Sequence, residues 1–208
     1  LFSAFASAEP LKVGDAAPAV TAVTDTGAKI ALADVYKQQP YTLVYFYPKA
    51  DTPGCTKQGC SLRDGYEALT KKGVAVIGVS HDTIADQKAF KEKHHFPFTL
   101  IADMDNKVIS AFGVPTYPMV GAAHRQAYLI KGGKIVYADY NGTTDKQAET
   151  ILKVIAALGL RFHAEPAGVK AMRRSRLARA RGPGGALEPV PLASLADEVV
   201  PRLPAGLG

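Results

Sequence analysis

Cysteine and tryptophan are scarce in this chain: two of its 208 residues are cysteine and none is tryptophan. Two cysteines exclude a disulfide-dense scaffold of the kind that holds small secreted domains together. No apolar run approaches the length of about 20 residues that a membrane-spanning helix needs, so no membrane partner is expected. Hydrophobic residues, in contrast, make up 47% of the chain, which at this length predicts a globular domain with a real core.

A strong basic excess is also absent from most of the chain, although the net charge of the whole is +6. Residues 1–158 carry 17 basic and 15 acidic side chains, a net charge of +2. Residues 159–208 carry 8 basic and 4 acidic side chains, a net charge of +4. Because the basic excess belongs mostly to the C-terminal segment, it is poor evidence for nucleic-acid binding, and no nucleic-acid partner is expected.

The two cysteines stand five residues apart in the run PKADTPGCTKQGC, at 48–60. This run follows a β-type apolar stretch and leads into a helical pattern. A thiol at the start of a helix lies among unpaired backbone N–H groups, at the positive end of the helix dipole. Such surroundings favour the thiolate, which is the reactive form of cysteine, so Cys55 is a candidate nucleophile.

Cys60 is expected to lie on the same helix as Cys55. Five residues of continuous helix separate two Cα atoms by about 8.7 Å, whereas a disulfide needs less than about 7 Å. The pair can therefore bond only after the intervening turn unwinds. Gly59 costs a helix interior about 1 kcal/mol relative to alanine, so this turn is expected to melt easily. The pattern indicates a reactive cysteine and a resolving cysteine; a structural disulfide in an exported protein is the alternative.

The residues around Cys55 resemble the peroxiredoxin active-site pattern Pro-x-x-x-Thr/Ser-x-x-Cys, here at 48–55. A second cysteine at +5 is similar to the peroxiredoxin Q group, also called bacterioferritin comigratory proteins. The likeness extends over residues 11–158 and includes VGDxAP at 13–18 and VIGVS at 76–80. The loop at 115–123 departs from the family pattern. The resemblance implies a thioredoxin-like fold and a thiol-dependent peroxidase.

The resemblance also implies a role for each matching residue. Cys55 would attack the peroxide O–O bond and become a sulfenic acid, and Cys60 would condense with it to a disulfide that a thioredoxin-like dithiol donor reduces. Thr52 would offer its hydroxyl to the thiolate or the peroxide, and Pro48 would shield the sulfur from water. Arg125 would hold the thiolate charged and orient the peroxide; an exposed charge is the alternative for this residue. The chemistry needs no metal, haem or flavin, so no cofactor is expected.

Alternating patterns predict an α/β fold with a central mixed sheet flanked by helices. Strands are expected at 20–25, 29–32, 41–47, 74–80 and 99–102, and a hairpin at 127–130 and 135–140. Helices are expected at 54–71, 83–95 and 145–158. The apolar strand at 41–47 should lie in the middle of the sheet.

Both ends of the chain differ in composition from the part between them. Residues 1–10 contain ASA at 6–8, a small-residue pattern typical of a signal-peptide cleavage site. They are predicted to be a signal remnant, which favours export to the periplasm over a cytoplasmic location; a flexible alanine-rich N-terminus is the alternative. Residues 161–208, rich in arginine, proline and glycine, are predicted to be a disordered basic tail, which leaves 11–160 as the domain; a functional basic arm is the alternative for the tail.

Three other motifs have ordinary structural interpretations. The tripeptide DTG at 25–27 matches aspartic proteases, but their chemistry needs two such carboxylates and the chain has one copy, so a turn is expected. The histidines at 94–95 face different ways on a helix and are expected to end it rather than to bind a metal. The glycosylation pattern NGT at 141–143 is expected to mark a loop.

Two other functions remain open on the same fold. The first is a thiol–disulfide oxidoreductase, although such enzymes typically carry Cys-x-x-Cys and this chain does not. The second is a redox-sensing binding protein that uses the same cysteine switch, which slow oxidation without turnover would favour. With both cysteines on one chain, catalysis needs no partner subunit, so a monomer is compatible with the sequence.

Overall fold

The structure is a computed structural model that describes residues 9–163. The chain divides into two units, residues 1–160 and residues 161–208. Most of the predicted signal remnant and nearly all of the predicted tail lie outside the described residues. Those two assignments therefore stay predictions.

A five-stranded mixed sheet forms the centre of the domain. Its strands are β3 (Tyr41–Phe46), β4 (Val74–Ser80), β5 (Thr99–Ala102), β6 (Gln126–Lys131) and β7 (Lys134–Asp139). They lie in the order β5-β4-β3-β6-β7; β4 is parallel to β3 and β5, and β6 is antiparallel to β3 and β7. The mixed sheet is as predicted, with the apolar strand in the middle.

Strand β3 is buried on both faces, which explains its almost uninterrupted apolar sequence, YTLVYF. Successive side chains of a strand point to opposite faces of the sheet. Leu43 and Tyr45 accordingly belong to one core cluster, and Val44 and Phe46 to the other. Such a strand requires helices on both sides.

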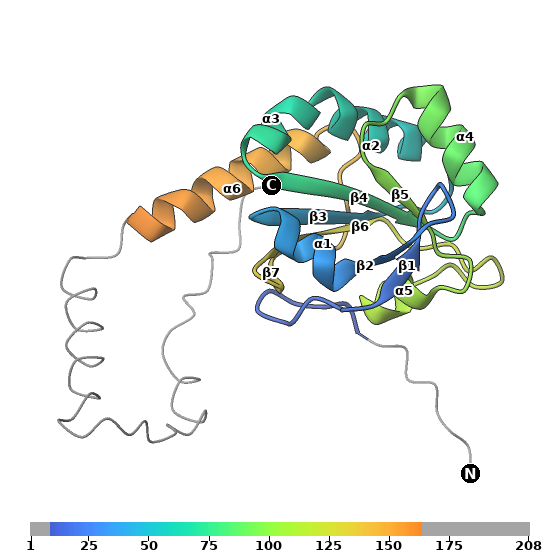
Figure 1. Ribbon diagram of the computed structural model, residues 1–208, viewed down its shortest axis with the longest axis horizontal. Coiled ribbons are helices and arrows are strands. Elements are labelled where there is room, and N and C mark those ends of the chain that lie inside the picture. Colours follow the sequence, from blue (N-terminus) through green and yellow to red (C-terminus); the bar gives the residue numbers. More distant parts are fainter. Residues whose placement is uncertain (1–8, 164–208) are drawn as a thin grey trace, which may run out of the picture. The chain divides into compact units, whose positions relative to one another are not determined.

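The helices divide between these two faces (Figure 1). They are α1 (Leu32–Gln38), α2 (Pro53–Asp64), α3 (Tyr66–Lys71), α4 (Ile84–His94), α5 (Lys107–Ala111) and α6 (Gln147–His163). Helices α2, α3, α4 and α6 cover the face of Leu43 and Tyr45. Helices α1 and α5 cover the other face, together with the hairpin of β1 (Thr21–Val23) and β2 (Lys29–Ala31).

The single helix predicted at 54–71 is two helices, so the predicted continuity was wrong. The break is at Gly65, where a Cβ atom would lie 2.5 Å from the Cβ of Ala148 in α6. No other residue type fits there, because α6 approaches the backbone too closely. The short helices α1 and α5 were not predicted, since 7 and 5 residues are too few for a clear helical period.

Gly59 has a packing role that its helix propensity does not reveal. A Cβ atom at this position would lie 2.4 Å from Cζ of Phe96, whose buried ring stacks on Phe98. The absent side chain lets this ring lie directly on α2, beside Cys60. The helical turn before Cys60 therefore has low helix propensity but well-formed tertiary contacts, and these contacts oppose the easy melting that the sequence predicts.

Gly59→Ala tests which of these two effects is larger. Alanine would gain about 1 kcal/mol of helix propensity, but overpacking against the buried Phe96 ring costs typically about 1–3 kcal/mol. We expect a net loss of stability of roughly 1 kcal/mol in urea unfolding of the reduced protein. Gly159→Ala is the matched control, since nothing lies within 4 Å of its added Cβ, and it should stabilise α6. Equal stabilisation by both substitutions would contradict the packing argument.

Candidate active site

The first turn of α2 places Cys55 at its third residue. Thr52 is the N-cap, with extended backbone angles, and Pro53 occupies the first helical position, where its fixed φ suits the helix start. The Cys55 side chain is only 2% exposed and is not in a disulfide. The free N–H groups of the first helical turn lie nearby in sequence, and the surroundings contain little water, so an anion at this sulfur depends on the donors that the protein supplies.

Arg125 supplies such a donor from another part of the chain. Its Nη2 donates a hydrogen bond to Cys55 Sγ at 3.3 Å, and its Nη1 donates to Oε1 of Gln58. Arg125 directly precedes β6, whose first residue, Gln126, pairs with Phe46 at the end of β3. The sheet register thus brings the arginine to the chain segment that leads into α2. The alternative of an exposed, unrelated charge was wrong.

Two glycines make room for the Arg125 side chain. A Cβ atom on Gly54 would lie 3.1 Å from its Nη2, and one on Gly142 would lie 2.6 Å from its Cγ. The guanidinium therefore passes between two bare backbone segments. The sequence predicts only a loop at Gly142 and indicates no role for Gly54. The sequence places Gly54 next to Cys55, but it does not show that Gly142 lies against the Arg125 side chain as well.

Gln58 and Gln147 were missed by the sequence analysis. Both are fully buried, and Nε2 of Gln58 donates to Oε1 of Gln147 at 3.0 Å, across 89 positions of sequence. The available signal was a glutamine three residues after Cys55, on the side of α2 that packs on the core. A buried amide needs partners, and its position beside the motif indicated where to search for them.

The other three predicted site residues, Thr52, Pro48 and Cys60, differ in their surroundings. The Thr52 hydroxyl donates its proton to the carbonyl of Lys49 at 2.9 Å, so its oxygen is left to act as an acceptor. Cys60 is half-buried, free, and on the same continuous helix as Cys55, as predicted. Pro48 is half-buried and lines a pocket.

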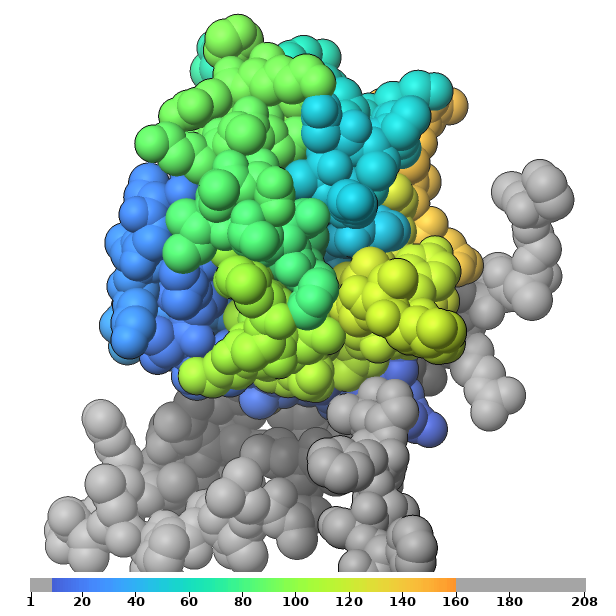
Figure 2. All heavy atoms as spheres, turned by 90° about the vertical axis from the view of Figure 1, so that its right-hand side faces the viewer, coloured from blue at the N-terminus to red at the C-terminus, as the bar shows by residue number. Residues whose placement is uncertain are grey.

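That pocket has a volume of about 600 Å³ and lies between Pro48, the loop after β4 and the loop at 115–123. Figure 2 shows these segments meeting on one face, where the yellow-green loop at 115–123 lies next to the cyan chain around residue 50. Neither cysteine is among the lining residues. The shielding of the sulfur by Pro48 therefore stays a prediction.

A series of buried and half-buried hydrogen bonds fixes the loop that leads into α2. Tyr47 donates from its hydroxyl to Oε1 of Gln87, whose Nε2 donates to Ser80 Oγ at 2.7 Å. Ser80 donates in turn to Oδ2 of Asp82 at 2.6 Å, and the same oxygen accepts from the backbone N–H of Ala50 at 2.7 Å. Burial raises the pKa of Tyr47 well above its usual value, so the phenol stays a donor. The loop is thereby tied to the end of β4.

Asp51 ties the same loop to the end of α4. Its backbone is left-handed, with φ 58°, and its carboxylate contacts Nζ of Lys93 at 2.6 Å and Nε2 of His94 at 2.9 Å. His94 also stacks on Phe96, the ring that covers Gly59. As predicted, the two histidines end a helix: His94 is the last residue of α4 and His95 its left-handed cap.

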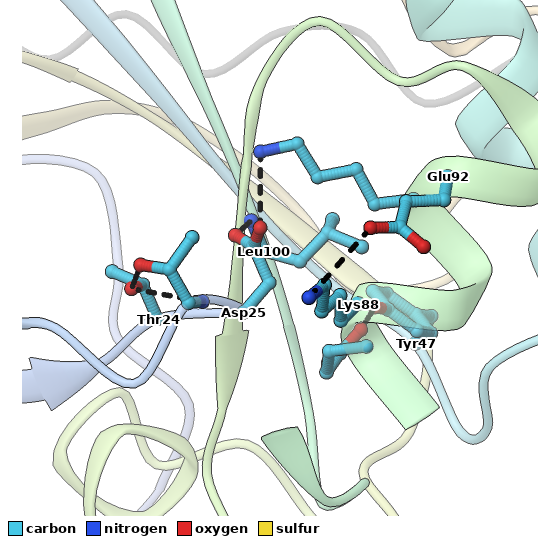
Figure 3. A network of polar contacts seen from close by, with 9 residues as sticks. Thr24, Asp25, Tyr47, Lys88, Glu92 and Leu100 are labelled. Atoms are coloured by element: carbon cyan, nitrogen blue, oxygen red, sulfur yellow. Dashed lines mark hydrogen bonds and ion pairs between the residues drawn. The ribbon is translucent and has the colours of Figure 1, made fainter. Parts of the chain in front are cut away.

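The tripeptide at 25–27 is a turn, as predicted, and its carboxylate has a structural role. Asp25, shown beside Leu100 in Figure 3, accepts the N–H of Leu100 at 3.0 Å. It also pairs with Lys91 at 3.1 Å. Between residues 9 and 163, no group of three histidine, cysteine or acidic side chains could hold a metal ion. Over the same residues, no helix is both long enough and apolar enough to cross a membrane.

Comparisons with known proteins agree on one family. The AhpC/TSA family profile matches residues 13–138. The chain is 40% identical over 147 residues to peroxiredoxin Q, chloroplastic, of Oryza sativa subsp. japonica, covering 70% of this chain and 67% of the relative. It is 44% identical over 104 residues to the putative peroxiredoxin bcp of Coxiella burnetii, covering 50% of this chain and 68% of that relative. The crystal structure of peroxidoxin BcpB from Mycobacterium tuberculosis superposes with a TM-score of 0.66 at 26% identity, covering 71% of this chain and 97% of that one.

Replacing Arg125 should slow the reaction of Cys55 with a small alkylating agent. Hydrogen bonds to charged groups contribute about 1.5–3 kcal/mol, so Arg125→Met should lower the iodoacetamide rate at neutral pH by about tenfold or more. Arg125→Lys keeps the charge but loses the two-point contact with Cys55 and Gln58. Its alkylation rate should lie between the rates of the unmodified protein and of Arg125→Met. The assay uses a Cys60→Ser background so that only Cys55 reacts.

Arg63→Met is the control for this series, because it also removes one arginine charge, in this case from α2 itself. Arg63 contacts Asp64 and the carbonyl of His94 and makes no contact with Cys55. An equal slowing in Arg63→Met and Arg125→Met would show that general charge, rather than the contact, matters.

The pKa of the Asp51 carboxyl should rise when its partners are removed. Hydrogen bonds from His94 and then Lys93 lower this pKa below its usual 3.8. A carboxyl with a lower pKa in the folded state contributes stability above the unfolded pKa, and this contribution is lost as the pH falls through the folded value. By carboxyl-carbon NMR titration, His94→Phe should raise the Asp51 pKa more than Lys93→Met does. The reverse order would contradict the assignment of His94 as the main partner.

Proposed function

Because the chain belongs to the AhpC/TSA family, and within it to the peroxiredoxins of the Q group, we propose that Cys55 is the nucleophile of its thiol-dependent peroxidase reaction. One observation carries this assignment: the Arg125 guanidinium donates to a buried cysteine sulfur at a helix N-terminus. A thiolate in this place is stabilised by a fixed positive charge and by backbone N–H groups. The family implies a peroxide as the substrate.

In the first step, the Cys55 thiolate attacks one oxygen of the peroxide. A sulfur–oxygen bond forms and the O–O bond breaks. The second oxygen takes up the proton that the thiol released on ionising and leaves as water or an alcohol, so that a sulfenic acid remains on Cys55. Arg125 orients the peroxide and stabilises the negative charge that moves onto the leaving oxygen. The Thr52 hydroxyl, whose proton goes to the Lys49 carbonyl, accepts the O–H of the bound peroxide.

In the second step, Cys60 resolves the sulfenic acid. Its sulfur attacks the Cys55 sulfur, an intramolecular disulfide forms, and the sulfenic oxygen leaves as water. Because both cysteines lie on one continuous helix, the turn between them must first unwind. Unwinding separates Gly59 from the Phe96 ring, so this packing contributes to the barrier of the step.

A dithiol reductant completes the cycle, and the family implies one of the thioredoxin kind. Its thiolate attacks the Cys55–Cys60 disulfide, and two electrons and two protons restore both thiols. No step needs a residue from a second copy of the chain. We therefore propose that the protein acts as a monomer.

Intact mass separates the two cysteine roles. The reduced protein treated with one equivalent of hydrogen peroxide should rapidly lose two hydrogens, whereas Cys55→Ser should not react. Cys60→Ser should gain one or two oxygens, as sulfenic or sulfinic acid. Slow oxidation of the unmodified protein would instead favour thiol exchange or redox sensing. A dithiol reductant that fails to restore the oxidised protein would overturn the proposed recycling.

A further inference from the structure

Gln147, the first residue of α6, lies at the end of a buried chain of hydrogen bonds that starts at the reactive sulfur. The chain runs from Cys55 to Arg125, then to Gln58, and ends at Gln147. Both glutamines are fully buried. Of these four hydrogen-bonded residues, Gln147 alone comes from α6, so it connects the closing helix of the domain to Arg125.

The direction of every hydrogen bond in this chain is fixed by chemistry. A guanidinium has only donors, so Gln58 must turn its oxygen toward Arg125. Its nitrogen then faces the other way and needs an acceptor, which Oε1 of Gln147 provides at 3.0 Å. A side chain without an acceptor at position 147 would leave the Gln58 nitrogen buried and unpaired, and Gln58 would turn or shift away from Arg125.

The geometry at Gln147 has a local cost. Its own Nε2 is buried and has no hydrogen-bond partner among residues 9–163. An unpaired buried donor costs about 1–3 kcal/mol, so the Gln147 amide is kept in place at the expense of its own nitrogen. Departures from good packing or pairing that have no local compensation are expected at functional sites. The orphan nitrogen thus points to a task for the Oε1 atom.

The start of α6 also contacts α2 at two further places. The backbone N–H of Ala148 donates to Ser61 Oγ at 3.3 Å, and the Ala148 Cβ occupies the space over Gly65. Residues 58, 61 and 65 lie on one face of the α2–α3 segment. The first turn of α6 therefore braces the stretch of helix that includes the turn between Cys55 and Cys60.

We propose that Gln147 is a positioning residue that acts through Gln58. With α2 folded, it holds Gln58 so that Arg125 stays on the Cys55 sulfur. When the turn between the cysteines unwinds, Gln58 loses its hydrogen bonds to Arg125 and Gln147. Arg125 is then no longer held in place at the moment when Cys60 reaches the sulfenic acid. One glutamine thus links reactivity toward peroxide with the folded state of α2. This inference rests on the proposed function for its meaning, but its test does not require peroxide.

The test measures alkylation of Cys55 by iodoacetamide at neutral pH in a Cys60→Ser background. Gln147→Met keeps the length of the side chain and removes the strong acceptor. We expect a three- to tenfold slower reaction, in line with the loss of one hydrogen bond. Ser61→Ala is the matched control: it removes a contact between α6 and α2 outside the chain of hydrogen bonds, and should leave the rate unchanged. Cooperative thermal unfolding of each variant shows that it folds.

A double-mutant cycle separates positioning from packing. In a Gln58→Met background the effect of Gln147→Met should disappear, because Gln147 acts through Gln58. An additive effect, or an unchanged rate in the single Gln147→Met variant, would overturn the inference. These results do not depend on peroxide chemistry. If peroxide fails to oxidise the protein while the cycle behaves as expected, the proposed function fails and the positioning role stands.

A second readout uses the protein with both cysteines. Since Gln147→Met loosens the folded turn of α2, it should form the disulfide more readily and accumulate less sulfinic acid at a given excess of hydrogen peroxide. Mass spectrometry gives the ratio of the two products. If Gln147→Met accumulated more sulfinic acid than the unmodified protein, the inference that Gln58 is released on unwinding would be overturned.

Discussion

The contact between the Arg125 guanidinium and the Cys55 sulfur is the interaction on which the rest of the site depends. Cys55 is only 2% exposed, so little water can stabilise a negative charge on its sulfur, and protein donors must do so. The helix start provides dipoles, and Arg125 provides a charge that cannot be lost by deprotonation. The pairing of β6 with β3 sets its place, and bare backbone at Gly54 and Gly142 sets its path.

The helix that carries the sulfur must meet two opposing demands. It is folded when it presents Cys55 to its donors, and in the proposed cycle it must unwind for Cys60 to reach that sulfur. Helix propensity around Gly59 favours unwinding, whereas the Phe96 ring and the start of α6 oppose it. The balance is therefore set by tertiary packing on one face of α2 rather than by the sequence of the helix. Such packing can keep a weak helical turn folded until the chemistry requires its release.

Local patterns predicted much of this architecture from the sequence. The buried strand β3 and the hairpin over Gly132 and Gly133, with φ of 56° and 74°, follow from residue type and spacing alone. The proposal that Cys55 is the nucleophile also rests on a local pattern, because a thiol at a helix start lies at the positive end of the helix dipole. Arg125 came from the family resemblance, because no local rule shows where a loop arginine points. The break at Gly65 and the Gln58–Gln147 pair could not be predicted, because each depends on α6, more than eighty residues away.

A glutamine at position 58, rather than a glutamate, has an electrostatic consequence. A carboxylate would hold the guanidinium as firmly, but its negative charge would offset part of the field that Arg125 exerts on the Cys55 sulfur. A neutral amide orients the arginine and leaves its charge directed at the sulfur. The amide nitrogen, however, then requires its own buried acceptor, which a carboxylate would not need. Gln147 meets that requirement, so the start of α6 becomes part of the support of the active site because the partner of Arg125 is neutral.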